Sequence, residues 1–191
     1  MAKNDPQAEI KEKQRQRKWV LTIFFATIFI SGTISLASDA IMANSSIFVA
    51  FLILLLIVFV GIVFDIIGMA VATADEKPFH AMAARKVTGA RECIKLLRNA
   101  ERVSSICNDV VGDICGVVSG SASATIAALI LANVESGWPK AVSLVMSALV
   151  AGLTVGGKAI GKTIAVQSCT EIVHLVGRVI HGWNQFRKKK K

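Results

Sequence analysis

Two long apolar stretches near the amino terminus constrain the fold more than any other feature of the sequence. Trp19–Ser38 contains no charged residue, and Ile47–Ala72 contains only Asp65. A helix rises about 1.5 Å per residue, so roughly 20 residues cross the ~30 Å hydrocarbon core of a bilayer. Both stretches are therefore predicted to span a membrane as helices. A cleaved signal peptide ending near residues 37–40 is the alternative for the first stretch.

Two later apolar stretches, 108–134 and 141–157, complete a prediction of about four spans. The composition agrees, because only 18% of the residues are charged, against about 25% in soluble domains. Residues 39–46 and 135–140 then become outer loops, and Lys140 is the only basic residue in them among the 22 of the chain. The positive-inside rule places both termini in the cytoplasm. We expect a multi-pass protein of the cell (plasma) membrane.

The remaining segments are charged and predict helices outside the hydrocarbon. Pro78 suits a helix start, and Thr88-Gly89 suits a turn between two helices. Gly156-Gly157-Lys158 is predicted to break or kink the last span, before an amphipathic helix over 159–186 whose apolar face contains Val179 and Trp183. The predicted all-α organisation is a basic cytoplasmic tail (1–18), a transmembrane domain (19–157) with a cytoplasmic helical hairpin (75–107), and a juxtamembrane helix with a polybasic end (158–191).

Glycines recur every four residues at Gly112, Gly116 and Gly120, which places them on one stripe of the third predicted span. Such a stripe lets another helix approach closely in a membrane. Gly152 and Gly156 form a second pair with the same spacing. These stripes predict close helix packing, either within one chain or between two copies.

Oxygen-bearing side chains in and beside the spans predict a cation site. Hard cations such as Mg²⁺ prefer oxygen ligands, and an ionisable residue within a span is by default a functional-site hypothesis. The candidate metal ligands are Asp65, Asn108, Asp109, Asp113, Ser119 and Ser147. In the alternative interpretation, the acids at 109 and 113 are solvated or paired with Arg102 or Arg85, and the serines are small packing residues.

Other function classes have little support in the sequence. No basic patch is interleaved with stacking aromatic residues, so the net charge of +9 reflects topology rather than nucleic-acid binding. Residues 156–163 match the phosphate-loop spacing, but a membrane span precedes them instead of a strand, so a nucleotide site is not expected. Lys158 and Lys162 are instead expected to extend to the membrane–water interface. No catalytic motif is present, so we expect neither an enzyme nor a cofactor. The cysteines and histidines have no ligand-like spacing.

The sequence over 83–97, Ala-Ala-Arg-Lys-Val-Thr-Gly-Ala-Arg-Glu-Cys-Ile-Lys-Leu-Leu, followed by Cys107-Asn108-Asp109 and Asp113, resembles the membrane domain of the CorB/cyclin-M (CNNM) family of magnesium transporters. The resemblance implies a cytoplasmic hairpin after a membrane helix, a homodimer, and cation sites among the spans. It also implies Asn108 as a site residue, with Asp109 and Asp113 as substitutes for family asparagines. Where the family has Gly-Glu-x-x-Pro after its last span, this chain has Gly157-Lys158 or Gly161-Lys162.

We therefore expect an integral membrane protein that transports divalent cations of the Mg²⁺/Co²⁺ type or responds to them. Mg²⁺ would then be the transported or bound ion. The alternative is a non-transporting scaffold that dimerises through its glycine stripes. In both cases the polybasic end would attract anionic lipids, at about 1 kcal/mol per basic residue near the surface.

Overall fold

The structure, a computed structural model, describes residues 6–43, 45–133 and 139–189, and every regular element in these ranges is a helix. The elements are α1 (Pro6–Ala43), α2 (Ile47–Thr73), α3 (Lys77–Ala84), α4 (Ala90–Leu97), α5 (Ala100–Ser105), the π-helix η1 (Ile106–Gly112), α6 (Asp113–Asn133), α7 (Pro139–Gln167) and α8 (Cys169–Lys189). The all-α prediction is confirmed.

Four helical segments in the described part of the chain are long and apolar enough to cross a membrane. They are Arg17–Met42, Ile47–Thr73, Ala100–Leu131 and Ala141–Gln167. The third segment joins α5, η1 and α6 into one continuous helical path. The prediction of a polytopic membrane protein is confirmed at this level.

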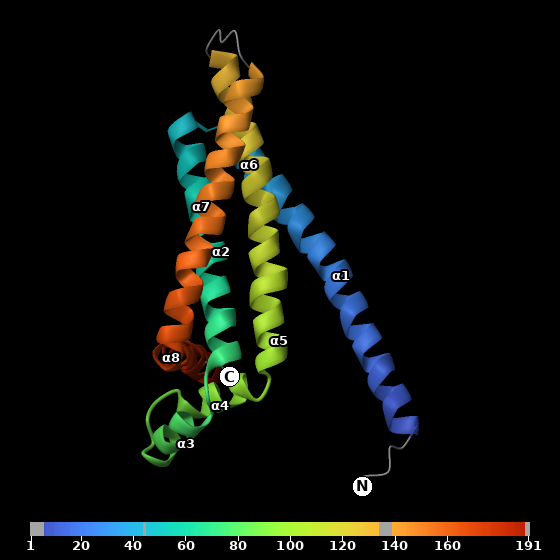
Figure 1. Cartoon of the computed structure of the whole chain (residues 1–191), viewed down its shortest axis with the longest axis vertical. Helices are drawn as coiled ribbons and strands as arrows, with labels where there is room; N and C mark the ends of the chain where they lie inside the picture. The colour runs from blue at the N-terminus through green and yellow to red at the C-terminus, as the bar shows by residue number, and fades with distance from the viewer. Residues whose placement is uncertain (1–5, 44, 134–138, 190–191) are drawn as a thin grey trace.

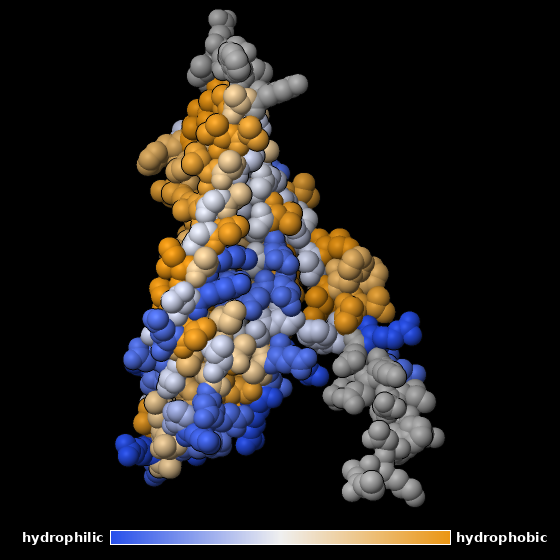
Figure 2. Space-filling model, in the orientation of Figure 1, coloured by the Kyte–Doolittle hydropathy of each residue, from blue (hydrophilic) through white to orange (hydrophobic). Residues whose placement is uncertain are grey.

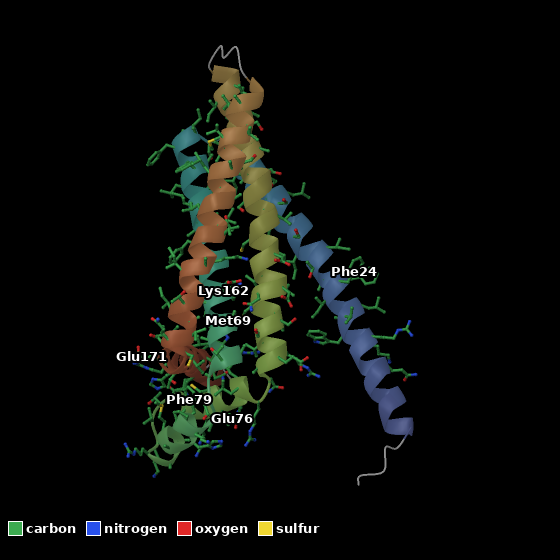
Figure 3. The ribbon with its side chains drawn as sticks, viewed as in Figure 1. Phe24, Met69, Glu76, Phe79, Lys162 and Glu171 are labelled. Atoms are coloured by element: carbon green, nitrogen blue, oxygen red, sulfur yellow. The ribbon has the colours of Figure 1, made fainter. Side chains whose placement is uncertain are left out.

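Helices α2, α6 and α7 pack together, whereas α1 leans away from them and meets α6 only near its carboxyl end (Figure 1). Polar side chains mark that meeting point: the Oγ atoms of Ser35 and Ser121 are 3.4 Å apart, and Thr125 donates a hydrogen bond to Asp39. Phe24 lies on the part of α1 that stands away from the bundle (Figure 3). Its ring is largely exposed, as a lipid-facing side chain would be.

The buried apolar side chains form two clusters at different heights of the bundle. One of them, which we call the outer cluster, consists of Met42, Ala50, Leu54, Val58, Ala122, Ile126 and Val150. The other, which we call the inner cluster, lies toward the hairpin and consists of Ala70, Val71, Phe79, Cys93, Leu97, Ala165 and Val173. Between Val58 and Ala70, the buried positions of α2 are Gly61, Asp65 and Gly68. A layer of glycine and polar side chains therefore separates the two clusters.

The short helices α3 and α4 form a hairpin at the end of the bundle where α8 also lies (Figure 1). Hydrophilic side chains gather over this end (Figure 2). Phe79, labelled in Figure 3, is fully buried and anchors α3 in the inner cluster. The predicted turn is confirmed: Gly89 has a φ of 87°, in the left-handed region that glycine tolerates best.

Helix α8 packs against α4 of the hairpin. His174 and His181, expected on the polar face, contact the hairpin at Thr88 and Glu92. Val179 and Trp183, on the predicted apolar face, are exposed. Val173 is instead the residue of α8 that is buried in the inner cluster, beside Cys93.

Several helix boundaries differ from the predictions. Helix α1 begins at Pro6 and continues to Ala43, so it includes much of the predicted tail and of the predicted loop 39–46. Within the predicted hairpin (75–107), α4 ends at Leu97 and a separate helix, α5, begins at Ala100. The predicted outer loop 135–140 lies mostly outside the described residues.

The predicted break at Gly156-Gly157-Lys158 is wrong, because α7 runs without interruption to Gln167 and α8 begins only at Cys169. The positions at Gly157 and Gly161 lie directly against Ile62 and Ile66 of α2. Glycine disfavours an isolated helix by about 1 kcal/mol, but close packing against a neighbouring helix overrides this preference.

Replacing Gly89 with Ala should detach the hairpin from α8. The new methyl carbon would lie 2.8 Å from the backbone nitrogen of Arg178, and the positive φ is strained for alanine. We expect a loss of about 2 kcal/mol or more, seen as a fall in melting temperature in detergent. Gly182→Ala in α8 is the matched control, since its added methyl group meets nothing within 4 Å. Equal melting temperatures for the two variants would contradict the close approach.

Candidate functional site

Asp65 lies on α2 in the polar layer between the two apolar clusters, and only 6% of the residue is exposed. Its Oδ1 atom is 3.6 Å from the Nζ atom of Lys158 on α7. Its Oδ2 atom is buried and has no hydrogen-bond partner among the described residues. Oδ1 therefore lies near the positive charge of Lys158, whereas Oδ2 has no hydrogen-bond donor among the described residues.

Glycines bring Lys158 to the level of Asp65. Gly157 and Gly161 have no side chains, so α7 lies directly on Ile62 and Ile66 of α2. Lys158 sits between these two glycines in the sequence and reaches Asp65 across the contact. The ammonium of Lys158 thus lies beside Asp65 rather than at the membrane–water interface where it was predicted. Lys162, one turn further along α7, is exposed (Figure 3).

Asn108 enters the same layer from the π-helix η1. A Cβ atom added to Gly68 would collide with Oδ1 of Asn108, so the amide lies against the α2 backbone. Its Nδ2 atom donates a hydrogen bond to Oγ of Ser104 at 3.3 Å. Its Oδ1 atom is buried and, within the described chain, accepts no hydrogen bond. Asn108 is thus the second group in this layer with an unsatisfied oxygen.

Gly112, the last residue of η1, leaves space beside the ion pair. A Cβ atom added there would lie 3.3 Å from Nζ of Lys158 and 3.8 Å from Oδ1 of Asp65. The wider π-helical turn of η1 presents both Asn108 and Gly112 to α2. Such π-helical turns are rare and often occur at functional sites.

Of the six predicted ligands, only Asp65 and Asn108 belong to this layer. Asp109 and Asp113 are exposed, and each directly follows a residue that faces α2. Asp109 accepts a hydrogen bond from Oγ of Ser105 at 2.6 Å. Within the described residues, the structure does not bring these two acids together with Asp65.

Ser119 and Ser147, the other two predicted ligands, line a pocket of about 200 Å³ between α6 and α7. Its wall comprises Gly116, Ser119, Gly120, Ser123, Ser147, Val150, Ala151, Thr154 and Val155. The Oγ atom of Ser123 is buried there without a partner in the described part of the chain. Gly116 lies one turn from Gly112, and Thr154 lies one turn from Lys158. The pocket therefore begins about 5 Å from the polar layer.

The donor set suits a hard, partly hydrated cation rather than a tightly caged metal. No group of three or more His, Cys, Asp or Glu side chains that could hold a metal occurs in the described residues. One carboxylate and one amide oxygen remain, and Mg²⁺ commonly binds through one or two carboxylates while it keeps several waters.

A second polar contact, Glu92 with His181, joins the hairpin to α8. Nδ1 of His181 is 3.0 Å from Oε1 of Glu92. Partial burial acts to raise the pKa of Glu92, but the hydrogen bond from His181, a local backbone hydrogen bond and the nearby positive charges outweigh it and lower the pKa below its ordinary value. This contact therefore stabilises the fold above the ordinary glutamate pKa and weakens as the pH falls through the lowered value.

Sequence reasoning missed Lys158 as the partner of Asp65. Two signals were present: a lysine inside an apolar helix and a glycine on each side of it, at 157 and 161. The missing information was the rotation of α7 about its axis, which decides whether the ammonium reaches a neighbouring helix or the interface.

A double-mutant cycle should show that Asp65 and Lys158 are coupled. Asp65→Asn leaves the ammonium without its counter-charge, so we expect a loss of about 3 kcal/mol, since breaking a buried pair from one side is costly. Asp65→Asn with Lys158→Met should lose less than Asp65→Asn alone. Thermal unfolding in detergent measures the double variant and each single variant, Asp65→Asn and Lys158→Met. Additive losses would mean that the two groups do not interact.

Comparisons with known proteins identified no matching family model, no matching curated protein and no matching solved structure. The resemblance to the CorB/cyclin-M family therefore remains a prediction from the sequence motifs.

Proposed function

We propose that this membrane protein binds divalent cations at the layer formed by Asp65 and Asn108, as a transporter or as a cation-responsive protein. The observation that carries the proposal is a pair of buried oxygens without partners among the described residues, Oδ2 of Asp65 on α2 and Oδ1 of Asn108 on η1. Both belong to the contact between these two elements.

Unsatisfied buried oxygens are costly, at about 1–3 kcal/mol for a neutral group and more for a charged one. A fold that retains two of them in one layer gains stability when a ligand satisfies both. The missing partners are positive charge or donors, and a hydrated divalent cation supplies both through its own charge and its waters.

One observation supports passage of an ion beside a structural role. The pocket lined by Ser119, Ser123 and Ser147 begins one helical turn away and offers hydroxyl oxygens between α6 and α7. We place the hairpin and both termini on the cytoplasmic side of the cell membrane, because the basic residues concentrate there. The exposed Val179 and Trp183 of α8, with the polybasic end, would contact anionic lipid.

Mg²⁺ should raise the melting temperature of the purified protein in detergent beyond NaCl at matched ionic strength. Asp65→Asn should remove this difference, because the carboxylate supplies the only full negative charge of the proposed site. Asp109→Asn, at an exposed acid, is the matched control and should keep it. A wild-type protein whose melting temperature does not depend on Mg²⁺ would contradict the proposal.

A second candidate function, a scaffold that associates with its own copies, rests on a separate observation. Cβ atoms added at Gly116, Gly120, Gly152 or Gly156 would meet nothing within 4 Å. No side chain is therefore packed closely on these positions in the described chain, and Gly116 and Gly120 border the pocket between α6 and α7. Open small-residue stripes of this kind are the surfaces through which membrane helices associate.

Cysteine crosslinking tests this scaffold. In a background with serine at the partly exposed Cys115 and Cys169, Gly116→Cys should form a disulfide-linked dimer in membranes under mild oxidation. Gly32→Cys on α1 is the control, since it is also open but lies on another helix. Dimers from Gly32→Cys but not from Gly116→Cys would argue against association through the stripe.

A further inference from the structure

We infer that the ammonium group of Lys158 is a tethered competitor for the cation at Asp65, so that an incoming divalent ion binds only as Lys158 withdraws. This inference rests on the proposed function and adds how access to the site is regulated. The inference is based on the position of one charge: Nζ of Lys158 lies 3.6 Å from Oδ1 of Asp65, where a bound cation would be attracted.

The contact between the two side chains is an attraction of charges without a close hydrogen bond. A charge-assisted N–H···O bond is typically about 2.7–2.9 Å long, well below the 3.6 Å between Nζ and Oδ1. The ammonium leaves Oδ2 of Asp65 and Oδ1 of Asn108 without partners in the described structure. Lys158 therefore neutralises the layer and leaves two oxygens available to another ligand.

The exposure of the two partners indicates which of them can leave. The side chain of Lys158 is 23% exposed, whereas that of Asp65 is 8% exposed. Lysine also has a flexible four-carbon stem, while the aspartate is held close to the α2 backbone. The ammonium can therefore move away from the layer, and the carboxylate stays in it.

Gly112 provides the space for this exchange. A methyl group there would lie 3.3 Å from Nζ of Lys158, so glycine keeps this side of the ammonium free of side-chain atoms. On withdrawal, the layer changes from neutral to a single negative charge with three oxygens that have no protein partner among the described residues: both of Asp65 and Oδ1 of Asn108. This is a donor set for a hydrated hard cation.

Mg²⁺ titrations followed by thermal shift in detergent, at constant ionic strength, test the inference. Lys158→Met removes the charge and keeps a chain of similar length, and we expect an apparent Kd for Mg²⁺ about tenfold lower than in the wild type. Lys162→Met, at an exposed lysine one turn further along α7, is the control and should leave the apparent Kd unchanged.

If Lys158→Met is folded and binds Mg²⁺ no more tightly than a wild type that does bind, the tethered-competitor inference is overturned while the proposed function stands. If Lys158→Met binds Mg²⁺ and the wild type does not, the result supports the inference and contradicts cation binding by the wild type. Absence of binding in both proteins contradicts both. Should Lys158→Met fail to fold, Lys158→Arg gives the reverse test. Arginine keeps the single positive charge on a bulkier group that is always protonated, so tighter Mg²⁺ binding by this variant overturns the inference.

Discussion

Placing the carboxylate of Asp65 inside a bundle of apolar helices is the constraint on which the rest of the structure depends. A charge in this position needs a counter-charge and close neighbours that exclude lipid. Glycines provide the close neighbours: Gly157 and Gly161 bring α7 against α2, and Gly68 admits the amide of Asn108. Lys158 provides the counter-charge. The pattern of glycines along three different helices becomes intelligible once the position of this one carboxylate is known.

The polar layer divides the bundle into parts with different physical properties. Above and below it, apolar side chains fill the space between helices, and such packing resists rearrangement because any void loses contacts. Within the layer, Asp65 lies beside the charge of Lys158, and two oxygens have no partner among the described residues. The two apolar clusters can thus hold the backbone in place while side chains in the layer exchange partners.

The features that depend on the chain's own periodicity and composition could be predicted from the sequence. The lengths of the apolar runs gave the four spans, and Gly89 marked the turn of the hairpin. Features that depend on the rotation of one helix against another could not. Asp109 and Asp113 have the right chemistry for a cation site, but each follows directly after a residue that faces α2 and is itself exposed. The pairing of Lys158 with Asp65 required the same missing information.

The contact between the hairpin and α8 has a consequence for the order in which the chain folds during synthesis. Helices α3 and α4 have eight residues each, too few to be stable alone in water. Cys93 of α4 donates its hydrogen bond to the carbonyl of Val173, which the ribosome adds 80 residues later. Domains generally fold from the amino terminus as they emerge, but this hairpin lacks its contacts with α8 until α8 has been made. The hydrophilic end of the molecule, where the hairpin and α8 meet, is therefore completed last, after the four long apolar segments have been synthesised.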